Sequence, residues 1–270
     1  MNPNSGAHKR EMRRSMKRIA VFVYGVVCYG IFLATFLYAF GFVGNVLVPK
    51  SMDSGPSGPL AEAFLINAML LGGFAIQHSV MARGWFKRAL TRFIPEPAER
   101  STYVLLSSVM LILMFWKWQP MGGIIWEVES AAAQAILQTL CAFGWLLVLV
   151  STFLINHFDL FGLRQVWLYL RKERYTQLPF RTPALYRYVR HPLYLGWLFA
   201  FWMTPTMTAA HLLFAVLTTG YILAAIQFEE RDLVRIHGEQ YVQYRKSVPM
   251  IIPTGTAESA PTPSEMQASV

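Results

Sequence analysis

The feature that most constrains the fold is a series of long apolar segments separated by stretches where charged residues gather. A helix crosses the hydrocarbon layer of a bilayer with roughly 20 mostly apolar residues. Candidate spans lie near residues 19–48, 60–82, 102–118, 131–156, 192–207 and 209–228. The segment 192–207 is short and contains Pro205. We therefore expect a tilted or partly re-entrant arm there, which turns at residues 204–206 and leads into the last helix.

The composition points to the same environment. Of the 270 residues, 54% are hydrophobic and only 14% are charged. A soluble domain of this length needs less apolar surface than that. We therefore predict an all-α, polytopic integral membrane protein. It is expected to be a bundle of about six transmembrane helices, with the last two forming a hairpin and with cytoplasmic segments beside them.

The distribution of Lys and Arg predicts the orientation. Residues 1–18 hold six of these residues, 83–101 five, 157–192 seven and the chain after Phe228 four, whereas Lys50 and Lys117 are the only others. Basic residues accumulate in cytoplasmic loops. We expect both termini in the cytoplasm and a multi-pass protein of the inner (plasma) membrane. The net charge of +9 is then explained by anionic lipid headgroups, and no nucleic-acid partner is expected.

The chain divides into regions by composition. The expected regions are a basic cytoplasmic tail at 1–18, a four-helix membrane region at 19–156, and a connector with the hairpin at 157–253. Residues 254–270 are polar and aperiodic, which predicts a disordered tail. Residues 160–175 mix apolar and basic residues in a way typical of an interfacial helix. Cys28 and Cys141 lie in different spans, so packing is their expected role, and no metal site is predicted.

Polar residues gather at one membrane face of this topology. Ionisable groups at the edge of the hydrocarbon are costly and usually face a wet cavity, so the group is a candidate functional site. Its members are His78, Ser79, Asn156, His157, Asp159, Arg190, His191, Glu229 and Glu230.

A structural role remains open for several of these residues. His78, His157 and Asp159 taken singly are ordinary interfacial hydrogen-bonding groups, and Arg190 is an ordinary cytoplasmic anchor. The acidic pair at 229–230 is harder to explain, because carboxylates gain little at a surface of negative potential. A cationic ligand or a neighbouring Arg is its natural partner.

The chain resembles a family of membrane methyltransferases at this point. Arg-His-Pro-Leu-Tyr-Leu-Gly at 190–196, the acidic pair, Gly-Glu-Gln-Tyr at 238–241 and Val-Pro-Met-Ile-Ile-Pro at 248–253 occur in the order found in the isoprenylcysteine carboxyl methyltransferase superfamily. The segments 77–83 and 156–164 extend the resemblance to most of the chain. Within the superfamily, it is most similar to the bacterial methanethiol S-methyltransferases, which form dimethyl sulfide.

The resemblance implies that the cytoplasmic segments bind S-adenosylmethionine. It assigns cofactor contacts to Tyr186, His191, Pro192, Leu193, Tyr194 and Glu229, with Leu178, Pro179 and Phe180 beside them and Arg190 and Glu230 in the same motifs. The Gly-rich turn of soluble methyltransferases is absent from the sequence, so cofactor binding cannot depend on a Rossmann sheet. A carboxylate suits the ammonium and sulfonium groups of this cofactor, and its adenine can stack on an aromatic ring.

One position departs from the carboxyl methyltransferases. They carry an Arg, suited to a substrate carboxylate, four residues before the cofactor-binding Glu, whereas this chain has Ala225. A small neutral acceptor is therefore favoured, a volatile thiol. The thiolate is the nucleophile, so a base is needed. His78 and Asp159 are the candidate bases, with His157 or Ser79 orienting the sulfur.

Three other classes compete with this interpretation. A lipid or isoprenylcysteine methyltransferase would need a wide lateral opening. A non-catalytic superfamily member, of the kind associated with nitrogen-oxide metabolism, would lack some cofactor positions. A transporter would place its charged groups near the bilayer midplane. The sequence does not give the oligomeric state or the range of thiols accepted.

Overall fold

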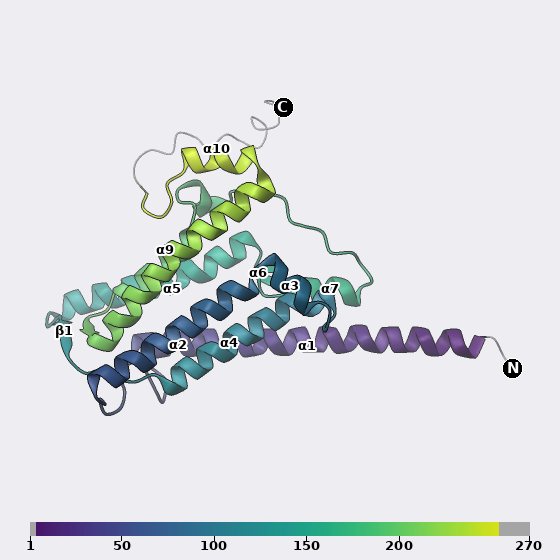
Figure 1. Cartoon of the computed structure of the whole chain (residues 1–270). Coiled ribbons are helices and arrows are strands. Elements are labelled where there is room, and N and C mark those ends of the chain that lie inside the picture. The colour runs from purple at the N-terminus through teal and green to yellow at the C-terminus, as the bar shows by residue number, and fades with distance from the viewer. Residues whose placement is uncertain (1–3, 254–270) are drawn as a thin grey trace. The chain divides into compact units, whose positions relative to one another are not determined.

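The computed structural model describes residues 4–253, so the predicted disordered tail at 254–270 lies outside the described residues. Within this range, five helices are long and apolar enough to cross a membrane. They are α1 (Asn4–Gly44), α2 (Leu60–Met81), α4 (Glu99–Lys117), α5 (Ala131–Ile155) and α9 (Ala209–His237) (Figure 1). The prediction of a multi-pass helical membrane protein is confirmed. The basic N-terminal segment is helical from Asn4 and continuous with the first span.

Shorter elements connect the long helices. They are α3 (Gly84–Leu90), η1 (Glu96–Ala98), β1 (Ile124–Glu127), α6 (His157–Leu160), α7 (Leu163–Leu170), η2 (Ala184–Arg187), α8 (Pro192–Trp202), β2 (Thr206–Thr208) and α10 (Glu239–Ser247). The expected arm at 192–207 is thus an 11-residue helix, α8, followed by a turn and a strand. At 1.5 Å per residue such a helix is too short to cross the hydrocarbon layer by itself.

The described residues form two compact units that do not follow the order of the chain. The first unit contains residues 4–51, Leu65–Trp118 and Asn156–Leu178. The second unit contains Met52–Phe64, Gln119–Ile155 and residues 179–253.

In the first unit, α1 packs against α4 and α7. Val166 of α7 is fully buried against Val21 and Ala98. A Cβ atom on Gly25 would lie 2.6 Å from Val166 Cγ2, so the absence of a side chain there lets α7 approach α1 closely. In place of one interfacial helix at 160–175, the structure has two short helices, α6 and α7, and the second ends at Leu170.

In the second unit, α8 packs against α5, and the two helices are closest at Gly144 and Gly196. We call this contact the α5–α8 seam. A Cβ on Gly144 would stand 2.6 Å from the backbone nitrogen of Ala200, and one on Gly196 would stand 2.8 Å from the carbonyl oxygen of Gly144. Small residues that allow backbones to touch in this way are a common basis of helix packing in membranes. The seam fixes α8, and with it the start of the His-Pro-Leu-Tyr segment.

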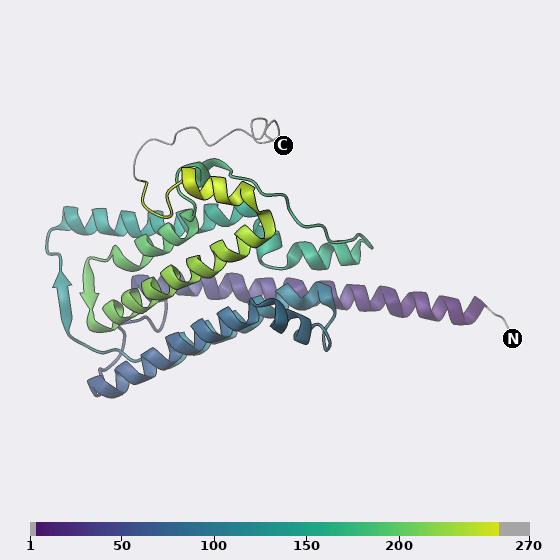
Figure 2. The same cartoon turned by 45° about the horizontal axis from the view of Figure 1, so that its top comes forward.

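A two-stranded antiparallel sheet joins the ends of α5 and α9 in the same unit. The strands β1 and β2 pair along Ile124–Glu127 and Thr206–Thr208 (Figure 2). The Thr208 hydroxyl accepts the backbone N–H of His211 at 3.1 Å, capping α9, and donates to Asp53 at 2.5 Å. This cap fixes the first turn of α9 at the opposite end from Glu229 and Glu230.

Candidate functional site

Arg190 and His191, at the start of α8, contact Glu230 in the C-terminal part of α9. Pro192 occupies the first turn of α8, where its missing N–H costs nothing, and His191 is the N-cap residue. Oε1 of Glu230 accepts hydrogen bonds from Arg190 Nε at 2.7 Å and from His191 Nε2 at 3.0 Å. All three side chains are at least 90% buried. A buried charge needs such a partner, and Arg190 supplies it.

Glu229 has a different environment, although it is the next residue of α9. It is exposed, and its Oε2 accepts a hydrogen bond from the Tyr194 hydroxyl at 2.9 Å. Successive helical residues point about 100° apart, so adjacent carboxylates on α9 face different surroundings. Glu229 is thereby available to a ligand, whereas Glu230 is committed to protein contacts.

The C-terminal strap, residues 248–251, pairs with the backbone of the Arg190–His191 segment. Pro249 and Met250 carbonyls accept the N–H groups of Arg190 at 2.9 Å and His191 at 3.1 Å. The Arg190 guanidinium also donates to the carbonyls of Val248 and, at 3.0 Å, Arg245. Arg190 is thus bonded to the strap through both its backbone and its side chain. The sequence contains this segment in the family motif, but no pattern in it predicted the pairing.

An aromatic group lies beside the strap. The Phe180 ring packs edge-on against Tyr241 at 5.7 Å and Tyr244 at 5.5 Å between centroids. The Tyr244 hydroxyl donates to the Tyr186 carbonyl at 2.6 Å. Tyr241 and Tyr244 are buried and were not among the predicted site residues; their spacing of three on α10, which places both on one face, was the available signal.

Tyr186 carries a hydroxyl that is buried without a hydrogen-bond partner among residues 4–253. Burial raises its pKa first, and the negative charge of Glu229 raises the pKa further. The hydroxyl therefore stays protonated and offers a donor. An unsatisfied buried donor is costly, which makes this atom a natural contact for a ligand.

The remaining predicted cofactor residues divide between the units. Leu193 is half-buried on α8 and Pro179 is exposed, both in the second unit. Leu178 belongs to the first unit. The second unit thus contains Pro179, Phe180, Tyr186, Arg190, His191, Pro192, Leu193, Tyr194, Glu229 and Glu230.

The four predicted catalytic residues lie in the first unit, and their contacts form separate groups. His78 is bonded at both ring nitrogens, by the Tyr103 hydroxyl at 2.7 Å and the Ser107 hydroxyl at 3.2 Å. The next residue, Ser79, accepts the Arg83 guanidinium at its carbonyl at 3.2 Å. His78 is therefore part of a closed hydrogen-bond network.

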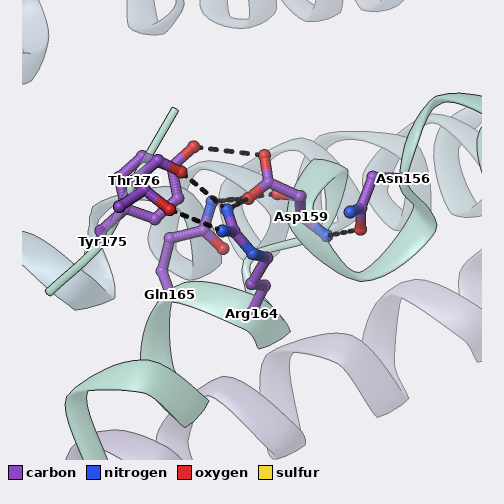
Figure 3. Close-up of polar contacts among 6 residues, drawn as sticks. All are labelled: Asn156, Asp159, Arg164, Gln165, Tyr175 and Thr176. Carbon is purple, nitrogen blue, oxygen red and sulfur yellow. Dashed lines mark hydrogen bonds and ion pairs between the residues drawn. The ribbon is translucent and has the colours of Figure 1, made fainter. Parts of the chain in front are cut away.

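Asp159 is the centre of a second group, drawn in Figure 3. Its Oδ1 accepts Arg164 Nη1 at 2.9 Å, and its Oδ2 accepts the Tyr175 hydroxyl at 3.3 Å. Arg164 also donates to the carbonyl and hydroxyl oxygens of Thr176, at 3.0 and 3.1 Å. Asn156 caps the helix that carries Asp159 by accepting its N–H at 3.1 Å. The group ties residues 175–176 to α6 and α7.

His157 is buried, and its Nε2 is 2.8 Å from the Tyr29 hydroxyl. Burial lowers the pKa of His157. The imidazole is therefore neutral at physiological pH.

The described residues contain no group of three or more His, Cys, Asp or Glu placed to hold a metal ion. The second unit instead offers an accessible carboxylate, a protonated buried hydroxyl and aromatic rings. That combination suits an organic ligand that carries a cationic amine and a flat ring system.

Comparison with known proteins identifies the family. No family model and no solved structure matches the chain. It is 60% identical to the methanethiol S-methyltransferase of Crocosphaera subtropica, over 88% of this chain and 93% of that protein. It is 54% identical to the methanethiol S-methyltransferase of Mycobacterium tuberculosis, over 88% and 98%. A more distant match is nurim of Xenopus laevis, 28% identical over 64% of each chain. The chain belongs to the methanethiol S-methyltransferase family.

Proposed function

We propose that the protein methylates methanethiol to dimethyl sulfide with S-adenosylmethionine as the methyl donor. Two lines support the proposal. Relatives that cover most of the chain are named methanethiol S-methyltransferase. The second unit contains all the residues that the superfamily resemblance assigned to the cofactor except Leu178.

The observation that carries the cofactor assignment is the surroundings of Glu229. Its carboxylate is exposed beside the Tyr194 hydroxyl, and the Tyr186 hydroxyl is buried without a partner in the described chain. Glu229 would balance the ammonium group of S-adenosylmethionine, and Tyr186 and Tyr194 would supply polar contacts. Phe180, which is only partly buried, would contact the adenine. When bound, the cofactor supplies an electrophilic methyl group.

The residues of the chain favour a small acceptor. Ala225 stands one turn before Glu229, where it offers no charge to a substrate carboxylate. Apolar helices exclude water, and a dry site favours a step in which a thiolate and a sulfonium neutralise each other. Volatile thiols dissolve in lipid, so the membrane itself is a route to such a site.

The assignment of His78, Ser79, His157 and Asp159 as catalytic residues stays a prediction. Their contacts add detail to it. Asp159 is held by Arg164, whose guanidinium forms an ion pair with the carboxylate at 2.9 Å. A positioning role at the 175–176 segment is therefore better supported for Asp159 than a role as a free base.

The location follows from the basic segments. The Lys and Arg residues that flank the apolar helices are concentrated in the segments 1–18, 83–101, 157–192 and the chain after Phe228. We propose that the protein lies in the inner membrane and that these segments face the cytoplasm, the compartment that supplies the water-soluble S-adenosylmethionine.

Headspace gas chromatography on purified protein tests the function. The protein is given S-adenosylmethionine and either methanethiol or a prenylcysteine, with Glu229→Ala as the inactive control. We expect dimethyl sulfide from the wild type and none from the control. Methylation of the prenylcysteine alone would replace the proposed acceptor with a lipid-like carboxylate.

A further inference from the structure

We propose that His191 is the catalytic proton acceptor for the thiol and that Glu230 is its positioning residue. The inference rests on the proposed function, because it names the base of that reaction. Both residues were assigned above to the neighbourhood of the cofactor, and their mutual hydrogen bond gives His191 a further role.

The hydrogen bond between the two residues fixes the tautomer of His191. Glu230 Oε1 lies 3.0 Å from His191 Nε2 and 2.7 Å from Arg190 Nε. The guanidinium keeps Glu230 ionised, and an ionised carboxylate only accepts hydrogen bonds. Nε2 must therefore carry the ring hydrogen, and in the neutral imidazole the lone pair is on Nδ1.

Nδ1 of His191 is left without a partner. No residue in the described range 4–253 forms a hydrogen bond with it. Nδ1 of His211 also lacks a partner among these residues, but it is fully buried. Nδ1 of His191 is not among the fully buried atoms. By contrast, both ring nitrogens of His78 are already bonded. Nδ1 of His191 carries a basic lone pair on the side of the ring away from the Glu230 carboxylate, which is the arrangement of a general base oriented by a carboxylate.

The charged groups beside His191 are paired with each other in the structure. Arg190 and Glu230 compensate each other while His191 is neutral, and the carboxylate then stabilises the imidazolium formed after proton transfer. The titratable or charged groups that surround this pair on the packed elements are Arg190, Tyr194, Glu229, Glu230, Tyr241, Tyr244 and Arg245.

The proposed step balances in atoms and charge. The S–H bond of methanethiol breaks, its proton binds Nδ1, and the electron pair stays on sulfur. The thiolate sulfur then forms a bond to the methyl carbon as the bond from that carbon to the sulfonium sulfur of the donor breaks. Dimethyl sulfide and S-adenosylhomocysteine are the products, and the proton leaves His191 for water.

The pH dependence of His191→Gln separates this role from a cofactor contact. The glutamine amide can donate to Glu230 as Nε2 does, but it offers no base. At neutral pH we expect a rate about 100-fold or more below that of the wild type. As the pH rises, methanethiol ionises by itself, so the deficit should narrow. Affinity for S-adenosylhomocysteine, measured by calorimetry, should stay within a few-fold of wild type.

Two further variants complete the test. Glu230→Gln can donate its amide to Nε2 and move the ring hydrogen to Nδ1, so it should show the same pH-dependent deficit. His8→Gln replaces an exposed histidine of α1 and should match the wild type.

Three results would overturn the inference while leaving the proposed function intact: a His191→Gln rate equal to wild type, a deficit that is the same at every pH, or a loss of cofactor affinity as large as the loss of rate. A wild-type protein that makes no dimethyl sulfide would instead overturn the proposed function.

Discussion

Glu229 and Glu230 are adjacent residues whose side chains meet opposite surroundings. Glu230 is buried against Arg190 and His191, and Glu229 is exposed beside Tyr194. The sequence indicated that the acidic pair needed a cationic ligand or a neighbouring Arg. In the structure Arg190 is the partner of Glu230, which leaves Glu229 for the ligand. Which carboxylate took which partner depends on the rotation of α9 against α8, and sequence spacing does not contain that information.

Replacing Glu229 by Gln should weaken cofactor binding more than it weakens the fold. The exposed carboxylate forms no ion pair with another residue of the range 4–253, whereas a hydrogen bond to a charged ligand group is worth about 1.5–3 kcal/mol. We expect the Kd for S-adenosylhomocysteine, measured by calorimetry, to rise about 10- to 100-fold. Glu173→Gln, at an exposed pair with Arg171, is the matched control. Equal affinities for the wild type and Glu229→Gln would refute the assignment of this carboxylate.

His157 should make folding stability depend on pH. Burial lowers its pKa in the folded state, so the unfolded chain binds a proton more readily. The stability contribution is complete above the unfolded pKa of about 6.5 and is lost as the pH falls toward the folded pKa. Thermal unfolding in detergent between about pH 7 and 5 should show a smaller loss for His157→Gln than for the wild type. Parallel curves for the two proteins would contradict this account.

Among the elements, the long helices were predictable and the two short strands were not. Five spans carry enough apolar residues to be read from the sequence alone. The strands β1 and β2 have four and three residues, too short to show alternation. The helix α8 ends at Trp202, before Pro205, because the chain turns and pairs with β1. Such pairing joins segments some 80 residues apart, and local periodicity cannot report it.

The α5–α8 seam should be intolerant of side chains. A Cβ on Gly196 would stand 2.8 Å from backbone atoms of Gly144 and Val148, and backbone cannot move aside cheaply. We expect Gly196→Ala to destabilise the protein by about 1–3 kcal/mol, measured as a lower Tm in detergent. Gly220→Ala on α9 faces open space and should leave the Tm unchanged or slightly raised. A Gly196→Ala variant as stable as Gly220→Ala would show that the helices are not in close contact.

At the scale of the whole molecule, two units are built from interleaved parts of one chain. Sequence order predicted a membrane region followed by a cofactor-binding region. The packing groups α5 with α8 and α9, and the connector up to Leu178 with α1 and α4. Composition does not predict this grouping, because apolar helices of similar length do not differ in a way that shows which helix each packs against.

The basic segments predict how the molecule is oriented in the membrane. Single cysteines introduced at Gly58, between α1 and α2, and at Lys172, after α7, should differ in labelling. In intact cells a membrane-impermeant maleimide should modify Gly58→Cys and spare Lys172→Cys, because only the latter is expected in the cytoplasm. The native Cys28 is fully buried, and the unmodified protein sets the background. Labelling of Lys172→Cys but not of Gly58→Cys would show that the protein has the opposite orientation in the membrane.

Transfer of a labelled methyl group tests the central claim most directly. Purified protein is supplied with S-adenosylmethionine deuterated in its sulfonium methyl group and with unlabelled methanethiol, and the headspace is examined by mass spectrometry. We expect dimethyl sulfide that carries one deuterated and one ordinary methyl group, and none from Glu229→Ala. Unlabelled product, or no product from a wild-type protein that still binds S-adenosylhomocysteine, would contradict the claim that this chain transfers a methyl group from that cofactor to a small thiol.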